Sequence, residues 1–231
     1  MQGTIKPRVK ICCISSMDEA MMAIQYGASA IGLVGKMPSG PGPIPDKLIL
    51  EIARHTPPPI ATFLLTSETS AEGIIRHHQN VMTNTIQMVD ELKSGTYAQI
   101  RQALPGIKLV QVIHVINAQS VLEAIRLSHF VDALLLDSGN PNLPIKQLGG
   151  TGRIHNWELS REIREAIDIP LFLAGGLNPD NIQAAIAFVQ PFGIDLCSGV
   201  RTNDHLDSIK LKNLFKAITG AKKQKKAMHI K

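Results

Sequence analysis

The sequence is poor in aromatic residues, in cysteine and in long apolar runs, and each shortage argues against a class of protein. Aromatic residues make up 4% of the 231 residues, which leaves few rings on which nucleic-acid bases could stack. No apolar run approaches the roughly 18 residues that would suggest a membrane-spanning helix, so no membrane partner is predicted. The three cysteines, two of them adjacent, form a poor disulfide framework and favour a reducing, cytoplasmic location.

Acidic residues are missing from the C-terminus, and the basic charge of the chain is concentrated there. The formal net charge is +5, and residues 221–231 contain five lysines and no acid. Residues 1–220 are therefore electrically balanced, and we expect them to form one domain. A short basic segment is typical of a solvated chain end. Residues 221–231 are predicted to be a Lys-rich, mobile tail, and no nucleic-acid partner is predicted.

Apolar segments of strand length alternate with helical segments along the whole domain. The expected strands are 9–14, 29–34, 59–65, 85–89, 107–115, 131–138, 170–174 and 193–198, and the expected helices are 16–27, 46–55, 70–78, 97–104, 119–127, 157–167, 178–189 and 207–219. Regular alternation favours parallel strands joined by helical crossovers. Eight such pairs in about 220 residues predict a single (β/α)8 TIM barrel. An open, doubly wound sheet is the alternative, but no Gly-x-Gly-x-x-Gly motif follows the first strand.

The sixth expected strand carries a candidate functional acid. The apolar run that begins at Val131 leads directly to Asp137, and a long loop containing Gly149-Gly-Thr-Gly152 follows. In parallel α/β folds, functional side chains lie at the carboxyl ends of the strands. Asp137 is therefore expected to face a ligand, and the alternative is that its carboxylate only caps a turn.

Two adjacent cysteines end the first expected strand. Because side chains alternate along a strand, only one of Cys12 and Cys13 is expected to face the barrel interior, while the other packs outward against helices. Ser16 and Glu19 then have the spacing of a capping box that opens the first helix, which Gly27 closes.

Glycine turns follow the seventh and eighth strands. Gly175 and Gly176 precede Asn178-Pro179, which we expect to open a helix, and Ser198 and Gly199 form the matching turn. The loops after strands seven and eight are the usual phosphate site of such barrels, because glycine lets backbone N–H groups approach phosphate oxygens. Phosphate binding is favoured over the alternative that these glycines serve only tight turns.

Five motifs, in this order and spacing, resemble the phosphoribosylanthranilate isomerase family of tryptophan biosynthesis, which has a TIM barrel of the ribulose-phosphate-binding type. They are Lys10-Ile-Cys-Cys-Ile14, Asp132-Ala-Leu-Leu-Leu-Asp137, Gly149-Gly-Thr-Gly152 with Trp157, Leu173-Ala-Gly-Gly-Leu-Asn-Pro179, and Asp195-x-Cys-Ser-Gly-Val200. The likeness runs from Lys10 to about Phe215. It implies an Amadori rearrangement, with Asp137 as the general acid and Cys12 as the general base.

The resemblance also implies the rest of the site. A phosphorylated small molecule is the expected partner of Gly175, Gly176, Ser198 and Gly199, and the loop containing Gly150, Gly152 and Arg153 is expected to meet the substrate. No metal and no cofactor are expected, since each step needs only a proton donor and a proton acceptor. A monomer or a homodimer is expected.

The chain departs from the family pattern on the anthranilate side. The family has Ser-Pro-Arg where this chain has Gly40-Pro-Gly42, so the Arg that would meet the substrate carboxylate is missing. The family glycine after the catalytic cysteine is Cys13, its Gln-Leu-His-Gly is Gln87-Met-Val-Asp90, and its Ser-Gly-Val-Glu ends in Arg201.

Two cations are candidates to replace the missing Arg, namely Lys36 and Arg153. Two alternative functions remain open at this point. One is a sister isomerase that acts on another phosphorylated aminosugar, and the other is a non-catalytic phosphate-binding barrel.

Overall fold

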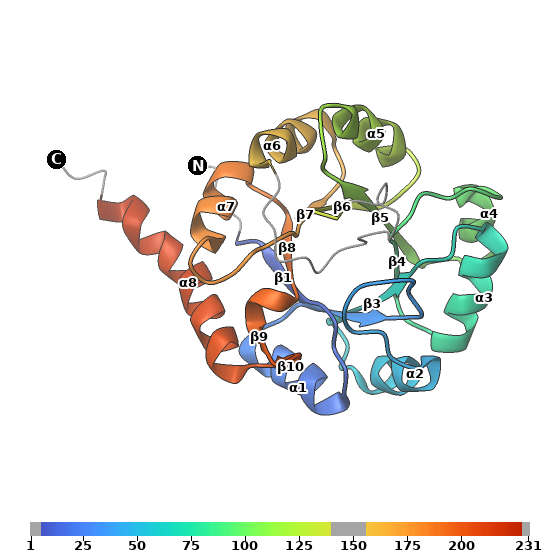
Figure 1. Cartoon of the computed structure of the whole chain (residues 1–231), viewed down its shortest axis with the longest axis horizontal. Coiled ribbons are helices and arrows are strands. Elements are labelled where there is room, and N and C mark those ends of the chain that lie inside the picture. Colours follow the sequence, from blue (N-terminus) through green and yellow to red (C-terminus); the bar gives the residue numbers. More distant parts are fainter. Residues whose placement is uncertain (1–5, 140–155, 228–231) are drawn as a thin grey trace.

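Eight parallel strands pair in sequence order and close into a barrel in the computed structural model, which describes residues 6–139 and 156–227 and the side chains up to residue 220 (Figure 1). The closure is made by β1, which pairs with β2 on one side and with β8 on the other. The strands are β1 Arg8–Ile11, β2 Ala30–Val34, β3 Ala61–Thr66, β4 Thr85–Met88, β5 Lys108–His114, β6 Ala133–Asp137, β7 Leu171–Leu173 and β8 Gly193–Leu196. The predicted TIM barrel is confirmed.

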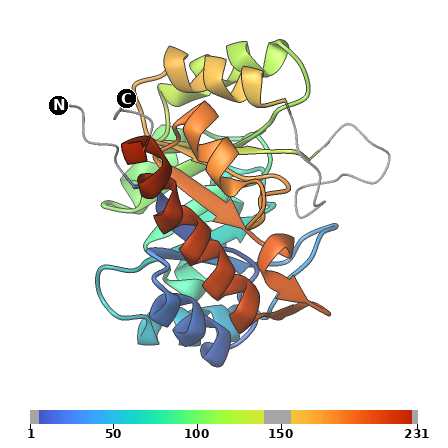
Figure 2. The same ribbon diagram turned by 90° about the vertical axis from the view of Figure 1, so that its left-hand side faces the viewer.

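In the described part of the chain, eight α-helices surround the strands (Figure 1). They are α1 Met17–Tyr26, α2 Asp46–His55, α3 Ala71–Val81, α4 Tyr97–Ala103, α5 Gln119–Ser128, α6 Trp157–Ala166, α7 Ile182–Val189 and α8 Ser208–Ala227. Figure 2 shows α8, in red, along the outside of the barrel, where it contacts α1 and α7. No helix in the described part of the chain is long and apolar enough to cross a membrane.

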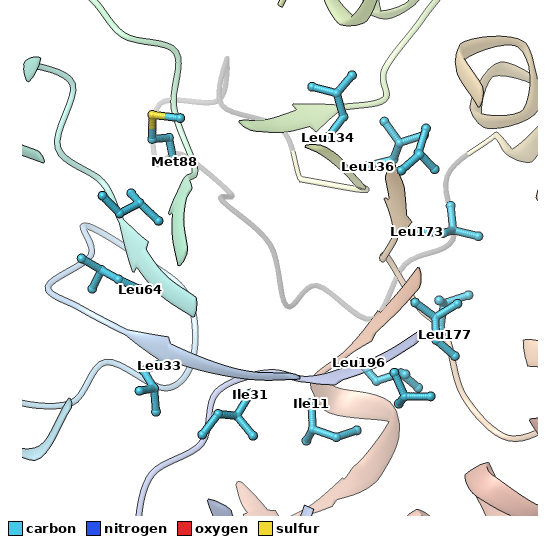
Figure 3. Packing of buried hydrophobic residues seen from close by; sticks show 14 of the residues in the cluster. Ile11, Ile31, Leu33, Leu64, Met88, Leu134, Leu136, Leu173, Leu177 and Leu196 are labelled. Carbon is cyan, nitrogen blue, oxygen red and sulfur yellow. The ribbon is translucent and has the colours of Figure 1, made fainter. Parts of the chain in front are cut away.

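Strand alternation produces two apolar layers. Between strands and helices lies the larger layer, whose labelled side chains in Figure 3 point outward from the ring of strands. Leu134 and Leu136 of β6 belong to this outer layer, whereas Ala133 and Leu135 belong to the smaller cluster inside the barrel. Asp137 continues the inward-facing series of β6, because residues two apart along a strand share a face. The strand therefore carries this carboxyl group to the mouth of the barrel.

Helix starts agree with the predictions where a local capping signal decides them. Ser16 accepts a hydrogen bond from the N–H of Glu19, and Gly27 ends α1 in the left-handed region at φ 109°. In contrast, α7 begins at Ile182 and not at Asn178. The Asn178 side chain accepts hydrogen bonds from the N–H groups of Asp180 and Asn181, so it closes a turn before the helix.

A short segment between β8 and α8 was not predicted. It consists of a 3-10 turn, η1 Ser198–Val200, and a small antiparallel hairpin, β9 Arg201–Thr202 and β10 His205–Leu206. In the side view of Figure 2, the orange strand β8 points toward the side of the barrel on which this hairpin lies. The turn η1 thus begins at the mouth of the barrel, directly after β8.

The last helix is longer than predicted, since α8 ends at Ala227 and not at Thr219. Among its described side chains, which end at Gly220, the buried apolar ones are Leu211, Leu214 and Ile218. Their spacing places them on one face of the helix. Figure 1 shows the end of α8 projecting beyond the ring of helices.

We expect residues 221–231 to be dispensable, because this segment carries the excess positive charge of the chain and its sequence lacks apolar periodicity. Truncation after Gly220 should leave the melting temperature unchanged. Truncation after Lys210, which also removes Leu211, Leu214 and Ile218, is the control. Each lost side chain contributes about 1.5–3 kcal/mol, so the control should melt at least about 10 °C lower. A fall of several degrees for the shorter truncation would contradict the prediction.

Candidate active site

A cavity opens at the carboxyl ends of the strands, and most of the predicted site residues that the structure describes line it. Its wall includes the predicted acid and base, Asp137 and Cys12, together with Gly175, Gly176 and Ser198. The remaining lining residues are Cys13, Val34, Met37, Ser39, Gly40, Pro41, Leu65, Gln87, Val89, Val112, Leu135, Ala174, Leu177, Asp195, Leu196 and Cys197. The wall is therefore apolar on the side of the barrel interior and carries its ionisable groups on β6, on β8 and in the residues that directly follow β1 and β8.

The surroundings of Asp137 raise the affinity of its carboxyl group for a proton. The side chain is 8% exposed, and its Oδ1 accepts a hydrogen bond of 2.7 Å from the N–H of Ser138. Burial raises the pKa of Asp137 to about 6, and the nearby Asp195 carboxylate adds to the rise, whereas Lys10 and Ser138 oppose it. A carboxyl group with this pKa can donate a proton near neutral pH. Its capping of Ser138 does not exclude this role.

Lys10 and Asp195 form a buried ion pair beside the two predicted catalytic groups. Lys10 Nζ lies 2.9 Å from Asp195 Oδ2, and the two side chains are 0% and 8% exposed. Burial, the largest single effect, lowers the pKa of Lys10, but Asp195, Cys12 and Cys13 together outweigh it and raise this pKa above its ordinary value. The lysine thus keeps its positive charge inside the barrel. Neither residue was predicted as functional, although both lie within the motifs that carry the family resemblance.

Cys12 lies between this charge and a second thiol. A hydrogen bond from the Cys13 side chain lowers the pKa of Cys12, burial opposes it, and the positive charge of Lys10 lowers the pKa further. Lys10 and Cys12 are two residues apart and point into the barrel together. Both need the space beside Gly32, where an added Cβ would lie 2.7 Å from Cys12 Sγ and 3.1 Å from Lys10 Nζ. The site therefore favours a thiolate at position 12.

The expectation that only one of Cys12 and Cys13 faces inward is wrong. Both side chains belong to the interior cluster and line the same cavity. The strand β1 ends at Ile11, and Cys13 adopts the left-handed region at φ 60°. Alternation holds only while the backbone stays extended, so the turn at Cys13 brings its thiol back to the side of Cys12.

Cys13 also explains why no side chain stands at position 42. Gly42 has φ 86°, and a Cβ there would lie 2.6 Å from Cys13 Cβ and 3.1 Å from Cys13 Cα. The Cys13 side chain thus fills the space that a side chain at position 42 would need. The two departures from the family pattern, Cys13 and Gly42, are coupled through this contact.

Arg201 fixes the backbone that carries both thiols, and its role was not predicted. Its guanidinium forms a two-pronged ion pair with Glu19, at 3.0 Å for each of Nη1–Oε1 and Nη2–Oε2. It also donates to the backbone carbonyls of Cys12 and Cys13. Glu19 accepts in addition from the N–H groups of Ser15 and Leu206. The predicted capping box is therefore only half formed, because Glu19 bonds to Arg201 and Ser15 and not to Ser16.

The two glycine turns lie against each other at the rim. Gly175 and Gly176 adopt the left-handed region at φ 79° and 65°, which strains other residues. A Cβ on Gly199 would overlap the carbonyl oxygen of Leu177, so Gly199 allows the two loops to touch. Gly199 itself does not line the cavity, in contrast to the other three predicted phosphate ligands.

None of the predicted substrate-loop residues is found in the described wall of the cavity. The Lys36 side chain is exposed and is absent from the cavity wall, although Met37 and Ser39 line it. Gly150, Gly152 and Arg153 lie outside the described residues.

Gln87, which was not predicted as a ligand, lines the cavity at 3% exposure, and its Oε1 has no hydrogen-bond partner within the described part of the chain. Within residues 6–139 and 156–227, no cluster of His, Cys, Asp or Glu could hold a metal ion.

Comparison with known proteins gives one consistent result. The family model of N-(5'-phosphoribosyl)anthranilate (PRA) isomerase matches residues 9–217. The N-(5'-phosphoribosyl)anthranilate isomerase 2 of Methanosarcina mazei is 34% identical over 209 residues, covering 89% of this chain and 91% of that protein. The corresponding isomerase of Methanosarcina acetivorans is 32% identical over 227 residues, covering 93% and 94%.

Solved structures agree with these sequence relatives. The phosphoribosyl anthranilate isomerase of Thermotoga maritima superposes with a TM-score of 0.76 at 27% identity, covering 93% of this chain and 99% of that one. A phosphoribosyl anthranilate isomerase in complex with reduced 1-(o-carboxyphenylamino)-1-deoxyribulose 5-phosphate gives a TM-score of 0.73 at 25% identity, with the same coverage.

The raised pKa of Asp137 predicts a pH-dependent cost to stability. The carboxyl group binds its proton more tightly in the folded chain than in the unfolded chain, where its pKa is 3.8. Stability should therefore fall as the pH rises from about 4 to about 6, by roughly 3 kcal/mol in total. Asp137→Asn should remove this cost, so urea unfolding should show the variant to be more stable than the parent at pH 8 but not at pH 4.

Asp132→Asn is the matched control with the opposite sign. Burial would raise the pKa of Asp132, but hydrogen bonds from the N–H of Leu109 and from Arg101 lower it. This variant should be less stable than the parent by nearly the same amount at pH 8 and at pH 4, because the stabilisation from the lowered pKa of Asp132 is lost only as the pH falls below about 4. An equal effect of Asp137→Asn at both pH values would contradict the burial argument.

The contact between Cys13 and Gly42 predicts a dependence of one substitution on the other. Gly42→Ala should lower the free energy of unfolding in the parent chain, by about 1–3 kcal/mol for the overlap with Cys13 alone. Gly106→Ala is the control for backbone strain, since Gly106 has the same φ of 86° and nothing within 4 Å of an added Cβ. In a Cys13→Gly background, the cost of Gly42→Ala should fall to that of Gly106→Ala. An unchanged cost would show that the thiol does not occupy this space.

Proposed function

The chain belongs to the family of N-(5'-phosphoribosyl)anthranilate isomerases, the isomerases of tryptophan biosynthesis, and from this premise we propose that Cys12 and Asp137 carry out its proton transfers. The observation that supports this most strongly is that both groups line one cavity with opposite protonation tendencies. The surroundings lower the pKa of Cys12 and raise that of Asp137, so both shift toward the neutral range, where a general base and a general acid work best.

Asp137 is proposed as the general acid that opens the sugar. Its proton passes to the furanose ring oxygen of N-(5'-phosphoribosyl)anthranilate, the bond between that oxygen and C1 breaks, and the lone pair of the anilino nitrogen forms the imine. The raised pKa of Asp137 supports this step, because an ordinary Asp would be almost fully ionised near neutral pH. The N–H of Ser138 donates a hydrogen bond to Asp137 Oδ1, and this bond orients the carboxyl group.

Cys12 is proposed as the general base for the second step. The thiolate removes the proton from C2, the electrons of that C–H bond form the enolamine, and tautomerisation gives the amino-ketose. The hydrogen bond from Cys13 and the charge of Lys10 support this assignment, since both stabilise the thiolate. The ion pair with Asp195 keeps Lys10 in place beside it.

The two ends of the substrate need separate anchors. We assign the phosphate to Gly175, Gly176, Ser198 and Gly199, because left-handed glycines and the start of η1 favour backbone donors that converge on an anion. We assign the anthranilate carboxylate to Lys36, at the rim beside Met37, with Arg153 as the second candidate. The coupling of Gly42 to Cys13 supports this relocation, since it leaves no room for a side chain at the family position.

The wider setting of the chain is also a proposal. A monomer or a homodimer in the cytoplasm, without a nucleic-acid partner, fits an isomerase of a biosynthetic pathway. One solved relative, from Thermotoga maritima, is described as mutually generated monomers of a dimeric isomerase, so either state is compatible with this fold.

Complementation tests the function directly. The chain should restore growth without tryptophan to a strain that lacks the isomerase, and Cys12→Ser and Asp137→Asn should not. Purified protein should convert N-(5'-phosphoribosyl)anthranilate to the amino-ketose. Failure of the folded parent in both assays would overturn the function and favour a different phosphorylated aminosugar as substrate.

Kinetics should separate chemistry from binding. Cys12→Ser and Asp137→Asn should lower kcat by about 10²- to 10⁴-fold, because each removes one proton transfer. Lys36→Ala should instead raise KM at least tenfold, since a charge-assisted hydrogen bond of about 1.5–3 kcal/mol is lost. Lys47→Ala, an exposed lysine on α2, is the control. If Lys36→Ala behaves like Lys47→Ala, the carboxylate is held elsewhere, and Arg153→Ala is the next variant.

A further inference from the structure

Three free thiols surround the cavity, and the proposed reaction uses only one as a base. Cys12, Cys13 and Cys197 all line the cavity wall. Cys13 comes from the turn after β1, and Cys197 directly follows β8 on the neighbouring side of the barrel. The Cys197 thiol donates a hydrogen bond to Cys13 Sγ at a distance of 2.7 Å. The two sulfur atoms need to approach by only about 0.7 Å to reach the length of a disulfide bond.

We propose that Cys13 and Cys197 form a reversible disulfide when the protein meets a peroxide. The overall step consumes one hydrogen peroxide, converts the two thiols into one disulfide and releases two waters. In the first half, the Cys197 thiolate attacks peroxide and, with one proton, becomes a sulfenic acid while one water leaves. In the second half, the Cys13 sulfur displaces the hydroxyl group, which leaves as the second water with the Cys13 proton. A dithiol reductant then reduces the disulfide back to the two thiols by thiol–disulfide exchange and is itself oxidised to a disulfide.

The choice of partners follows from geometry. Cys12 and Cys13 are adjacent, and Cα atoms across a trans peptide are about 3.8 Å apart, below the usual lower limit of about 4.4 Å for a disulfide. Cys13 and Cys197 carry no such restriction. Cys197 is also partly exposed, whereas Cys12 and Cys13 are buried, so a small oxidant reaches Cys197 first. The reaction therefore starts at Cys197 and ends on Cys13.

The surroundings hold Cys13 ready for this bond. Arg201 binds the carbonyl groups of Cys12 and Cys13, which fixes the backbone of the turn. Gly42 packs against the Cys13 side chain from the opposite loop. Because the sulfur is already placed, little conformational freedom is lost when the bond forms.

Oxidation should act on the neighbouring base as well, a consequence that rests on the proposed function. A disulfide removes the Cys13 S–H group, which is the hydrogen-bond donor to Cys12. The Cys12 thiol would then ionise at a higher pH, so isomerase activity near neutral pH should fall and return on reduction. Cys12 itself stays outside the disulfide and keeps its thiol.

The direct test counts thiols and does not depend on activity. After treatment of the folded full chain with one equivalent of hydrogen peroxide, denaturation and thiol titration should find one free thiol instead of three. The intact mass should fall by two hydrogens, peptide mapping should join Cys13 to Cys197, and a dithiol should restore three thiols. Three remaining thiols, a gain of oxygen mass alone, or a bond that includes Cys12 would overturn the proposal.

Variants sharpen the test. Cys12→Ser should lose both of its remaining thiols and form the same bond, whereas Cys197→Ser and Cys13→Ser should form no internal disulfide. Circular dichroism shows whether each variant is folded, and a non-reducing gel excludes bonds between chains. Either of the last two variants alone suffices, so a failure of one to fold leaves the other as the control. An internal disulfide in a folded Cys197→Ser chain would refute the assignment.

Activity is then measured for each protein against its own reduced form. Peroxide should lower the rate of the parent at least severalfold, and the dithiol should restore it. A mapped Cys13–Cys197 bond with an unchanged rate would refute the effect on Cys12 and leave the disulfide in place. If the reduced parent is inactive, the proposed function fails while the thiol count still decides the disulfide.

Discussion

The buried ion pair between Lys10 and Asp195 is the constraint on which both the closure of the barrel and its chemistry depend. The two residues are register partners on β1 and β8, the strands that join the beginning of the barrel to its end. A buried charge without a partner is strongly destabilising. A shift in the register of β1 against β8 would separate the two charges, so the ion pair favours the observed register. Its effects reach both predicted catalytic groups, because Lys10 favours the ionised form of Cys12 and Asp195 favours the protonated form of Asp137.

Because of this ion pair, the protonation of the proposed base, Cys12, and that of the proposed acid, Asp137, depend on each other. A change that removed Asp195 would leave Lys10 unpaired and would also lower the pKa of Asp137, since a repelling negative charge would be lost. The packing is equally specific, because Lys10 and Cys12 share the space that Gly32 leaves open and Lys10 lies over the ring of Phe63. The polarity of the site therefore arises from the strands themselves, whereas the loops supply the rim.

Local signals were sufficient to predict most of the fold and part of the site. The residues of α2 were predicted without error, and the position of Asp137 at the carboxyl end of β6 followed from the apolar run before it. Prediction failed where a distant contact decides the local structure. The turn at Cys13, the pairing of Glu19 with Arg201, and the contact of Gly42 with Cys13 each join segments that are remote in sequence or break the extended backbone. A periodic pattern holds no information about such contacts.

The pair formed by Glu19 and Arg201 has a consequence for exchanging parts between relatives. It joins α1, near the start of the chain, to the hairpin after β8, near its end. The family motif carries Glu where this chain carries Arg201, so a chimera with the first strands of this barrel and the last strands of a relative would bury two carboxylates against each other. Such a chimera would be destabilised at this contact unless residues 19 and 201 come from the same parent protein. The two residues therefore need to be exchanged together, although most of the barrel lies between them in the sequence.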